Sequence, residues 1–170
     1  MPNVIAAAQW LGQRANDVSV ALLTVMFATF ILQIFFRYII NEPLGWSEEV
    51  IVTVWLWTVL WGAAFVIRES EEIRFDIIYS NLSERMRRVF TVITGTVLIV
   101  VYGISLPATY SYVSFMKVER SAYLHIRIDV LYSVYVIFAV ASIIRYCFLV
   151  WHALRGDTPA PATNPSELGD

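Results

Sequence analysis

Residues 36–76 read FRYIINEPLGWSEEVIVTVWLWTVLWGAAFVIRESEEIRFD, and the rest of the chain is organised around this stretch. Charged residues stand at both of its ends, whereas 18 uncharged residues, Val50 to Ile67, fill its middle. Pro43 and Gly45 suit a turn ahead of a new helix, and Ser47 is placed to cap that helix. The pattern predicts a single membrane crossing whose entry and exit are marked by charge.

The expected helix has an acidic start. Glu48 and Glu49 fall in its first turn, where carboxylates suit the positive end of the helix dipole. Arg37 ends the preceding apolar run, so we expect Arg37, Glu48 and Glu49 to form a polar cluster at the membrane rim. The cluster would form within this chain or across to a partner. The alternative is three separately solvated charges, since exposed ion pairs contribute about 0.2–1 kcal/mol.

The tryptophans of this helix differ in depth. Trp46 stands at the rim, where tryptophan is enriched in membrane proteins. Trp57 and Trp61 are four residues apart and share a helix face. Trp55 and Trp57 lie deeper, and we assign both to packing against a neighbouring helix or a partner subunit. The small residues 62–64 would let another helix approach closely.

The overall composition is that of an integral membrane protein. Hydrophobic residues make up 58% of the 170 residues and charged residues 15%, against roughly 25% charged in soluble domains. The formal net charge of -2 argues against a nucleic-acid binder, which needs a basic face. Cys147 is the only cysteine, which excludes an internal disulfide and a cysteine-based metal cluster.

Three further apolar runs extend the pattern to an all-α protein with four transmembrane helices. We expect these helices at about residues 18–38, 48–67, 89–115 and 130–151, in one membrane domain of residues 1–155. A brief interfacial helix is expected within residues 1–17, and an amphipathic segment along the membrane surface at residues 68–88. Residues 156–170 are rich in proline and predict a disordered polar tail.

The third apolar run is the longest. It covers residues 89–116, which is roughly 42 Å of helix, so the helix must tilt, bend or protrude. Pro107 predicts a kink, because proline lacks an N–H and its ring crowds the preceding turn. Gly95 and Gly103 predict surfaces of close helix packing. In the fourth run, Arg145 is expected near the far headgroups, where a long side chain can snorkel.

No pattern of catalytic residues is present in the sequence. There is no nucleophile elbow, no phosphate-binding glycine loop and no histidine pair at metal spacing. We therefore predict no enzyme activity, no cofactor, and no catalytic, substrate-binding or metal-binding residue. His125 and His152 are expected near opposite membrane surfaces, which disfavours a haem-binding anchor of a respiratory complex. The apolar runs lack acidic residues, which disfavours a stand-alone small exporter.

The motifs of residues 36–76 together resemble the small membrane subunit of tripartite ATP-independent periplasmic (TRAP) transporters, the DctQ-like family. They comprise an Arg-Tyr pair at 37–38, Trp-Ser-Glu-Glu at 46–49, the region from Trp57 to Ala64, and Arg-Phe-Asp at 74–76. The candidate subunit-interface or structural residues are Arg37, Trp46, Ser47, Glu48, Glu49, Trp57, Trp61, Arg74 and Asp76.

The resemblance implies a function that the composition cannot show. Such a subunit pairs with a large DctM-like membrane subunit, which holds the substrate and sodium sites and moves them like an elevator. A DctP-like periplasmic protein delivers the substrate, usually an organic acid. The small subunit is a fixed scaffold anchored in the lipid of the bacterial inner membrane, and no nucleic acid is involved. The membrane anchor and the small exporter remain the alternatives.

The basic residues predict the orientation of the chain. Eight stand on the side of the termini and four on the opposite side, which puts both termini in the cytoplasm. The eight are Arg14, Arg68, Arg74, Arg85, Arg87, Arg88, Arg145 and Arg155, and the four are Arg37, Lys117, Arg120 and Arg127.

We predict that an impermeant maleimide labels Glu119→Cys, but not Glu71→Cys, in intact cells carrying a Cys147→Ser background. Residue 119 belongs to the side with fewer basic residues and should face the periplasm. Labelling after cell lysis serves as the control for reactivity of both cysteines. Labelling of residue 71 alone in intact cells would show that the topology is inverted.

Overall fold

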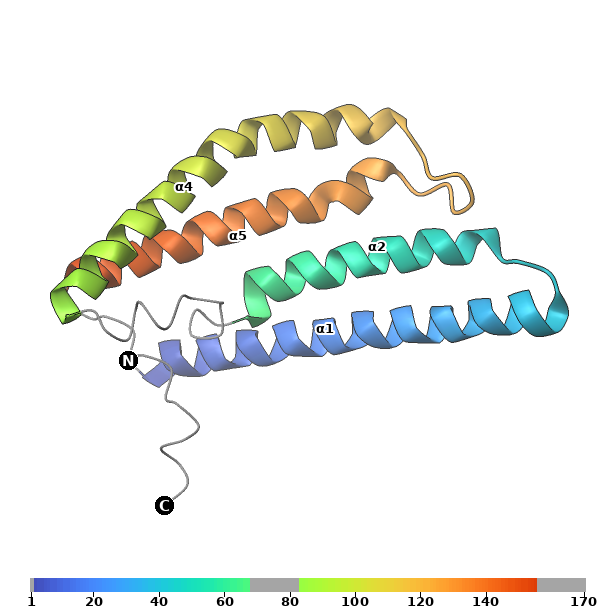
Figure 1. Ribbon diagram of the computed structural model, residues 1–170, viewed down its shortest axis with the longest axis horizontal. Coiled ribbons are helices and arrows are strands. Elements are labelled where there is room, and N and C mark those ends of the chain that lie inside the picture. The colour runs from blue at the N-terminus through green and yellow to red at the C-terminus, as the bar shows by residue number, and fades with distance from the viewer. Residues whose placement is uncertain (1, 68–82, 156–170) are drawn as a thin grey trace, which may run out of the picture. The chain divides into compact units, whose positions relative to one another are not determined.

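A computed structural model describes residues 2–67 and 83–155 of the chain. Their elements are α1 (Pro2–Phe35), the π-helical turn η1 (Phe36–Ile40), α2 (Gly45–Trp61), the π-helical turn η2 (Gly62–Val66), α4 (Glu84–Phe115), the short 3-10 turn η3 (Met116–Val118) and α5 (Ile128–Arg155). Figure 1 shows this order along the chain. The predicted all-α class is confirmed.

Four helical segments are long and apolar enough to cross a membrane, as predicted. They are Trp10–Ile40, Gly45–Val66, Arg85–Val118 and Ile128–Arg155. Most of the expected amphipathic segment, with Arg74 and Asp76, and the expected tail at 156–170 lie outside the described residues. Their predicted structures stay predictions.

The chain divides into two units, each built from segments distant in sequence. The first unit combines Met1–Val66 with Leu106–Ala139, and the second combines Ile67–Ser105 with Val140–Asp170. Helices α4 and α5 therefore contribute one half to each unit.

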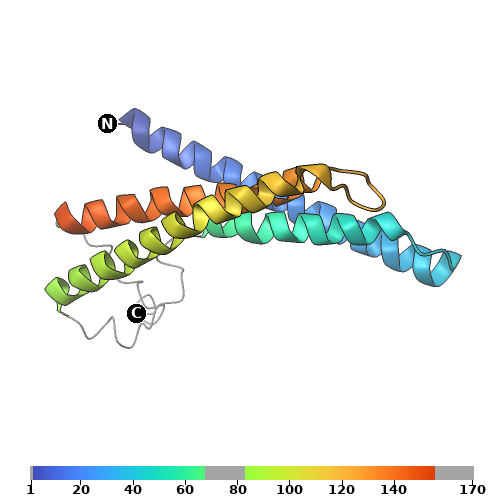
Figure 2. The same cartoon turned by 90° about the horizontal axis from the view of Figure 1, so that it is seen from above.

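In the first unit, α1 and α2 form an antiparallel pair, joined by a short connection (Figures 1 and 2). Asn41 ends η1 with a left-handed backbone (φ 62°), and its N–H donates to the Phe36 carbonyl. Asparagine adopts this conformation more readily than most residues, which explains its place at the turn. The N-terminal helix is not a separate element, because α1 runs unbroken from Pro2 to Phe35.

The start of α2 differs from the expectation. We expected Ser47 as the N-cap, but α2 begins at Gly45 and the extended residue Leu44 precedes it, so this prediction is wrong. Ser47 is fully buried, and its hydroxyl donates to the Leu44 carbonyl at 2.7 Å. A hydroxyl in the third helical position reaches back to a carbonyl rather than forward to free N–H groups, so Ser47 stabilises the first turn from inside. Glu48 lies in this turn, as predicted.

In the second unit, the first half of α4 packs against the second half of α5. Gly95 is buried, and a Cβ atom there would collide with a methyl group of Val150. Two helical turns after Gly95, the rings of Tyr102 and Tyr146 stack with their centroids 6.4 Å apart. The close packing predicted at Gly95 is confirmed. At Gly103, however, an added Cβ would meet no atom within 4 Å, so no other described segment packs closely against this glycine.

Helix α4 passes through Pro107 without interruption. The helix begins at Glu84, directly after Ser83, whose carbonyl accepts the Arg87 N–H at 3.0 Å. Proline therefore removes one hydrogen bond from α4 without ending it. The kink expected at this position stays a prediction.

We predict that Gly95→Leu lowers the thermal stability of the detergent-purified subunit, whereas Gly103→Leu does not. The new side chain at position 95 must displace Val150, and overpacking of this kind costs about 1–3 kcal/mol. Gly103 has open space for the same side chain. Thermal unfolding followed by circular dichroism measures both variants. Equal midpoints for the two would contradict the packing of α4 on α5 at Gly95.

Candidate functional site

The N-terminal end of α2 holds the loop that joins α4 to α5. The Glu49 carboxylate accepts two backbone hydrogen bonds from this loop, one from Tyr123 N–H at 2.9 Å and one from Leu124 N–H at 3.0 Å. Each carboxylate oxygen takes one of them. Hydrogen bonds to a charged acceptor are shorter and stronger than neutral ones. Glu49 therefore ties together two segments that are 74 residues apart in sequence.

The loop itself has the geometry of a small hairpin. Ser121 N–H donates to the Ile126 carbonyl at 2.9 Å, and Ile126 N–H donates to the Ser121 hydroxyl at 3.2 Å. Ile128 N–H closes the base of the hairpin on the Glu119 carbonyl at 3.1 Å. His125 takes the left-handed conformation (φ 52°) at the turn. This turn leaves the N–H groups of residues 123 and 124 directed at Glu49.

Gly45 makes the contact between α2 and the loop possible. A Cβ atom at this position would fall on the ring of Tyr123. The absence of a side chain lets the ring lie over the first turn of α2, beside the hydrogen bonds to Glu49. Gly45 thus serves close approach, in addition to the turn that the sequence predicted.

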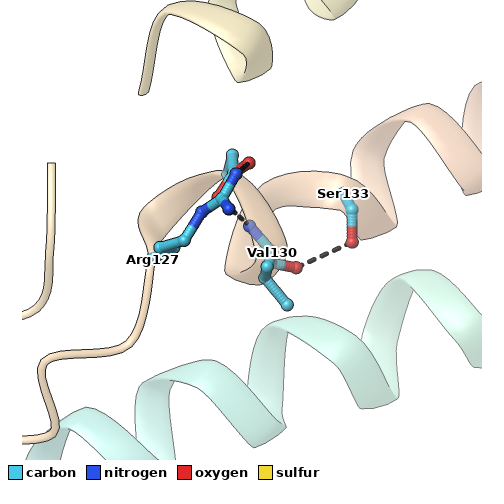
Figure 3. Close-up of polar contacts among 4 residues, drawn as sticks. Arg127, Val130 and Ser133 are labelled. Atoms are coloured by element: carbon cyan, nitrogen blue, oxygen red, sulfur yellow. Dashed lines mark hydrogen bonds and ion pairs between the residues drawn. The ribbon is translucent and has the colours of Figure 1, made fainter. Parts of the chain in front are cut away.

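The start of α5 is stabilised by a local ion pair. Arg127 donates two hydrogen bonds to the Asp129 carboxylate, at 3.1 and 2.6 Å, and Asp129 also accepts the Val130 N–H at 2.9 Å. The hydrogen bond to Asp129, with its charge, raises the pKa of Arg127 above its ordinary value. Figure 3 shows Arg127, Val130 and Ser133 in these first turns, with the Ser133 hydroxyl donating to the Val130 carbonyl.

Two tryptophans fix α2 between its neighbours. The Trp57 indole N–H donates to the Leu131 carbonyl of α5 at 3.0 Å, and the Trp61 indole N–H donates to the Ala15 carbonyl of α1 at 3.1 Å. Packing of Trp57 against a neighbouring helix is therefore as expected. Although the two share a face of α2, each reaches a different helix. Phe65 packs on Trp61, with ring centroids 4.6 Å apart.

The polar cluster expected at the rim does not form within the chain. Among the described residues, Arg37 makes no ion pair with Glu48 or Glu49, and its guanidinium lies over the ring of Tyr38 instead, 5.9 Å from the centroid. The Glu49 carboxylate instead accepts hydrogen bonds from the backbone N–H groups of the α4–α5 loop. A contact from Arg37 or Glu48 across to a partner stays a prediction.

The opposite face of α2 is open. Glu48, Val52, Trp55 and Val59 are all exposed and follow one another at helical spacing. Trp55 lies on the other side of α2 from Trp57, roughly 200° away around the helix axis, since each residue advances an α-helix by about 100°. Trp46, at the rim, is partly exposed as well. Of the predicted interface residues on α2, Ser47, Glu49, Trp57 and Trp61 thus lie inward, whereas Glu48 and Trp46 are open to the surroundings.

A hollow lined by tyrosines lies in the same unit, where the second half of α4 meets the first half of α5. It has a volume of about 440 Å³ and is lined by Ala108, Thr109, Tyr112, Val113, Tyr132 and Tyr135. Tyr112 stacks on Tyr132 with centroids 6.4 Å apart, and Tyr132 meets Tyr135 edge to face at 5.9 Å. These ring contacts show the hollow to be part of the α4–α5 packing.

Sequence reasoning missed Gly45, Tyr123 and Leu124 as partners in the loop contact. The two loop residues act through backbone N–H groups, which every residue except proline possesses. The sequence did indicate that Gly45 and Glu49, four residues apart, share one face of the helix, so that a segment packed against the glycine would also meet the carboxylate.

We predict that Glu49→Gln accelerates amide hydrogen exchange at Tyr123 and Leu124, whereas Glu48→Gln leaves it unchanged. The glutamine amide offers one acceptor oxygen in place of two and removes the charge, so one loop N–H loses its partner. Hydrogen exchange with mass spectrometry of the purified subunit resolves the loop peptide. Unchanged protection in Glu49→Gln would contradict the attachment of the loop by this carboxylate.

The chain matches the family described as tripartite ATP-independent periplasmic transporters, DctQ component, over residues 17–156. No curated protein matches the chain. The matched range includes most of the first helix with membrane-spanning length, the whole of the other three, and the loop held by Glu49. The chain belongs to the DctQ family and is the small membrane component of a TRAP transporter.

Proposed function

We propose that this chain is the static brace of a sodium-coupled TRAP transporter that takes up an organic acid. In this proposal a large DctM-like membrane subunit carries the substrate and sodium sites, and a DctP-like periplasmic protein delivers the substrate. The DctQ chain catalyses no reaction and enlarges the immobile part of the permease in the lipid bilayer. Family membership identifies the chain as the small membrane component of a TRAP transporter. The sodium coupling and the class of substrate are our proposal.

The observation that carries the proposal is that polar groups within the spans form hydrogen bonds to the chain's own backbone. The indole N–H groups of Trp57 and Trp61 are bound to backbone carbonyls of neighbouring helices. Four hydroxyls donate to the carbonyl four residues earlier in their own helix, namely Ser19, Thr24, Thr29 and Thr58. Donors that hold helices together or bond within a helix are poorly placed to bind a transported ion. This arrangement supports a rigid support element.

The continuity of the helices supports the same role. Transporters commonly bind anions at the ends of helices broken near the middle of the membrane. Helix α4 is continuous even at Pro107, and the acidic residues Glu48 and Asp129 lie in the first turns of α2 and α5. These two carboxylates therefore lie at the ends of their spans, whereas the basic Arg145 lies inside α5.

We further propose that the chain lies in the bacterial inner membrane with both termini in the cytoplasm. The basic residues favour this orientation. At the N-terminal side of α1, Arg14 lies over Trp10 at 5.5 Å, and at the end of α5, Arg155 lies over Trp151 at 4.6 Å. Paired arginine and tryptophan side chains suit the headgroup region, because both have an apolar body and a polar end.

We predict that omission of this chain abolishes sodium-driven uptake in reconstituted vesicles that contain the large subunit and the periplasmic protein. The moving subunit needs a fixed counterpart in the membrane, and its substrate site alone is not sufficient. Adding the chain back is the control and should restore uptake. The purified chain alone should show no saturable binding of the transported substrate by calorimetry. Uptake that persists without the chain would contradict its role as a required brace.

A further inference from the structure

The open face of α2 carries an unsatisfied polar group in the middle of the membrane. Trp55 is 56% exposed, between Val52 at 63% and Val59 at 49%. Ten residues separate it from the start of α2 at Gly45, which places it about 15 Å along a span of 22 residues. Trp55 therefore lies near mid-depth, below the headgroup level at which tryptophans usually find polar partners.

No described residue accepts a hydrogen bond from the Trp55 indole N–H. Two other indoles deep in the helix show what this environment demands, because Trp57 and Trp61 each donate to a carbonyl at 3.0–3.1 Å. Trp46, at the first turn of α2, stands at the rim, where headgroups and water can accept its N–H. Lipid tails offer no acceptor, and a polar group without a partner is unfavourable in hydrocarbon. The Trp55 N–H is therefore open to an acceptor from another protein chain.

Glu48 extends the same face to the rim. It is exposed and makes no ion pair with a described residue, in contrast to Glu49 one position later. Glu48 precedes Val52 by four residues and Trp55 by seven, so all three are aligned along the helix. A partner that covers this face meets a carboxylate at its end, two small valines, and a large indole between them.

We propose that the face formed by Glu48, Val52, Trp55 and Val59 binds a transmembrane helix of the large subunit. That helix brings a carbonyl or hydroxyl oxygen to Trp55 at mid-depth and a basic side chain to Glu48 at the rim. The proposal rests on the proposed function, which supplies the large subunit as the partner. It adds the surface through which the brace is attached. Trp57 and Trp61, on the other side of α2, hold the helix in its own subunit.

Photocrosslinking in native membranes tests the location of this surface. Benzoyl-phenylalanine introduced at Val52 or Val59 should attach to the large subunit, identified by mass spectrometry of the product. The same probe at Phe27, an apolar residue of α1 that is 66% exposed, serves as the matched control and should attach to lipid. Equal attachment to the large subunit from Phe27 and Val52 would overturn the assignment to α2. So would a product that joins two copies of this chain through Val52.

The two proposals fail in different ways. If the unmodified chain retains the large subunit during purification but probes at Val52 and Val59 attach only to lipid, the assigned face is wrong and the proposed function stands. If the large subunit is absent from the purified material and from every photoproduct, the proposed function itself fails.

Two tryptophan variants test the chemistry of the contact. Trp55→Phe removes the indole N–H and should weaken retention of the large subunit about threefold to fifteenfold, the range of single hydrogen bonds between membrane helices. The thermal midpoint of the isolated subunit should stay the same. Trp57→Phe should lower that midpoint, because its N–H holds Leu131 within the chain. Unchanged retention in Trp55→Phe would overturn the assignment of Trp55 as the buried donor.

Discussion

The constraint on which this structure depends is the absence of water in the hydrocarbon core. A polar group inside the membrane must find its partner in protein, since lipid tails cannot supply one. Trp57 and Trp61 meet this requirement by donating to the backbone carbonyls of Leu131 and Ala15. Because the two acceptors belong to α5 and α1, satisfying the indoles also determines where α2 lies in its unit. The same hydrogen bonds that satisfy the indoles therefore also hold α2 against α5 and α1.

The same principle operates at the end of α2, with a carboxylate as the acceptor. Glu49 binds two N–H groups of the α4–α5 loop, and Gly45 lets the Tyr123 ring lie against the helix. Glu48, the neighbouring residue, takes no part in these hydrogen bonds and is exposed. Two adjacent acidic residues in one motif therefore have different surroundings. The first is exposed, and the second holds the α4–α5 loop against α2.

A subunit built in this way suits a supporting function. The described polar groups inside its spans are largely bonded within the chain, and its long helices are continuous. Membership of the DctQ family places the chain beside other components of a TRAP transporter. Trp55 departs from the pattern, because its indole N–H has no acceptor among the described residues. That departure is the observation from which we infer a contact between this face of α2 and another protein chain.

The sequence by itself determined the class, the four spans and the family. Hydropathy is read along the chain, and the motifs of residues 36–76 are local, so neither requires knowledge of distant contacts. Tertiary structure alone decided which polar groups meet. Ser47 was misread as a cap because α2 begins two residues earlier, and the partner of Glu49 was out of reach because its donors are backbone amides 74 and 75 residues away. Trp55 and Trp57 look alike in sequence, yet the helical twist turns one outward and the other onto a carbonyl of α5.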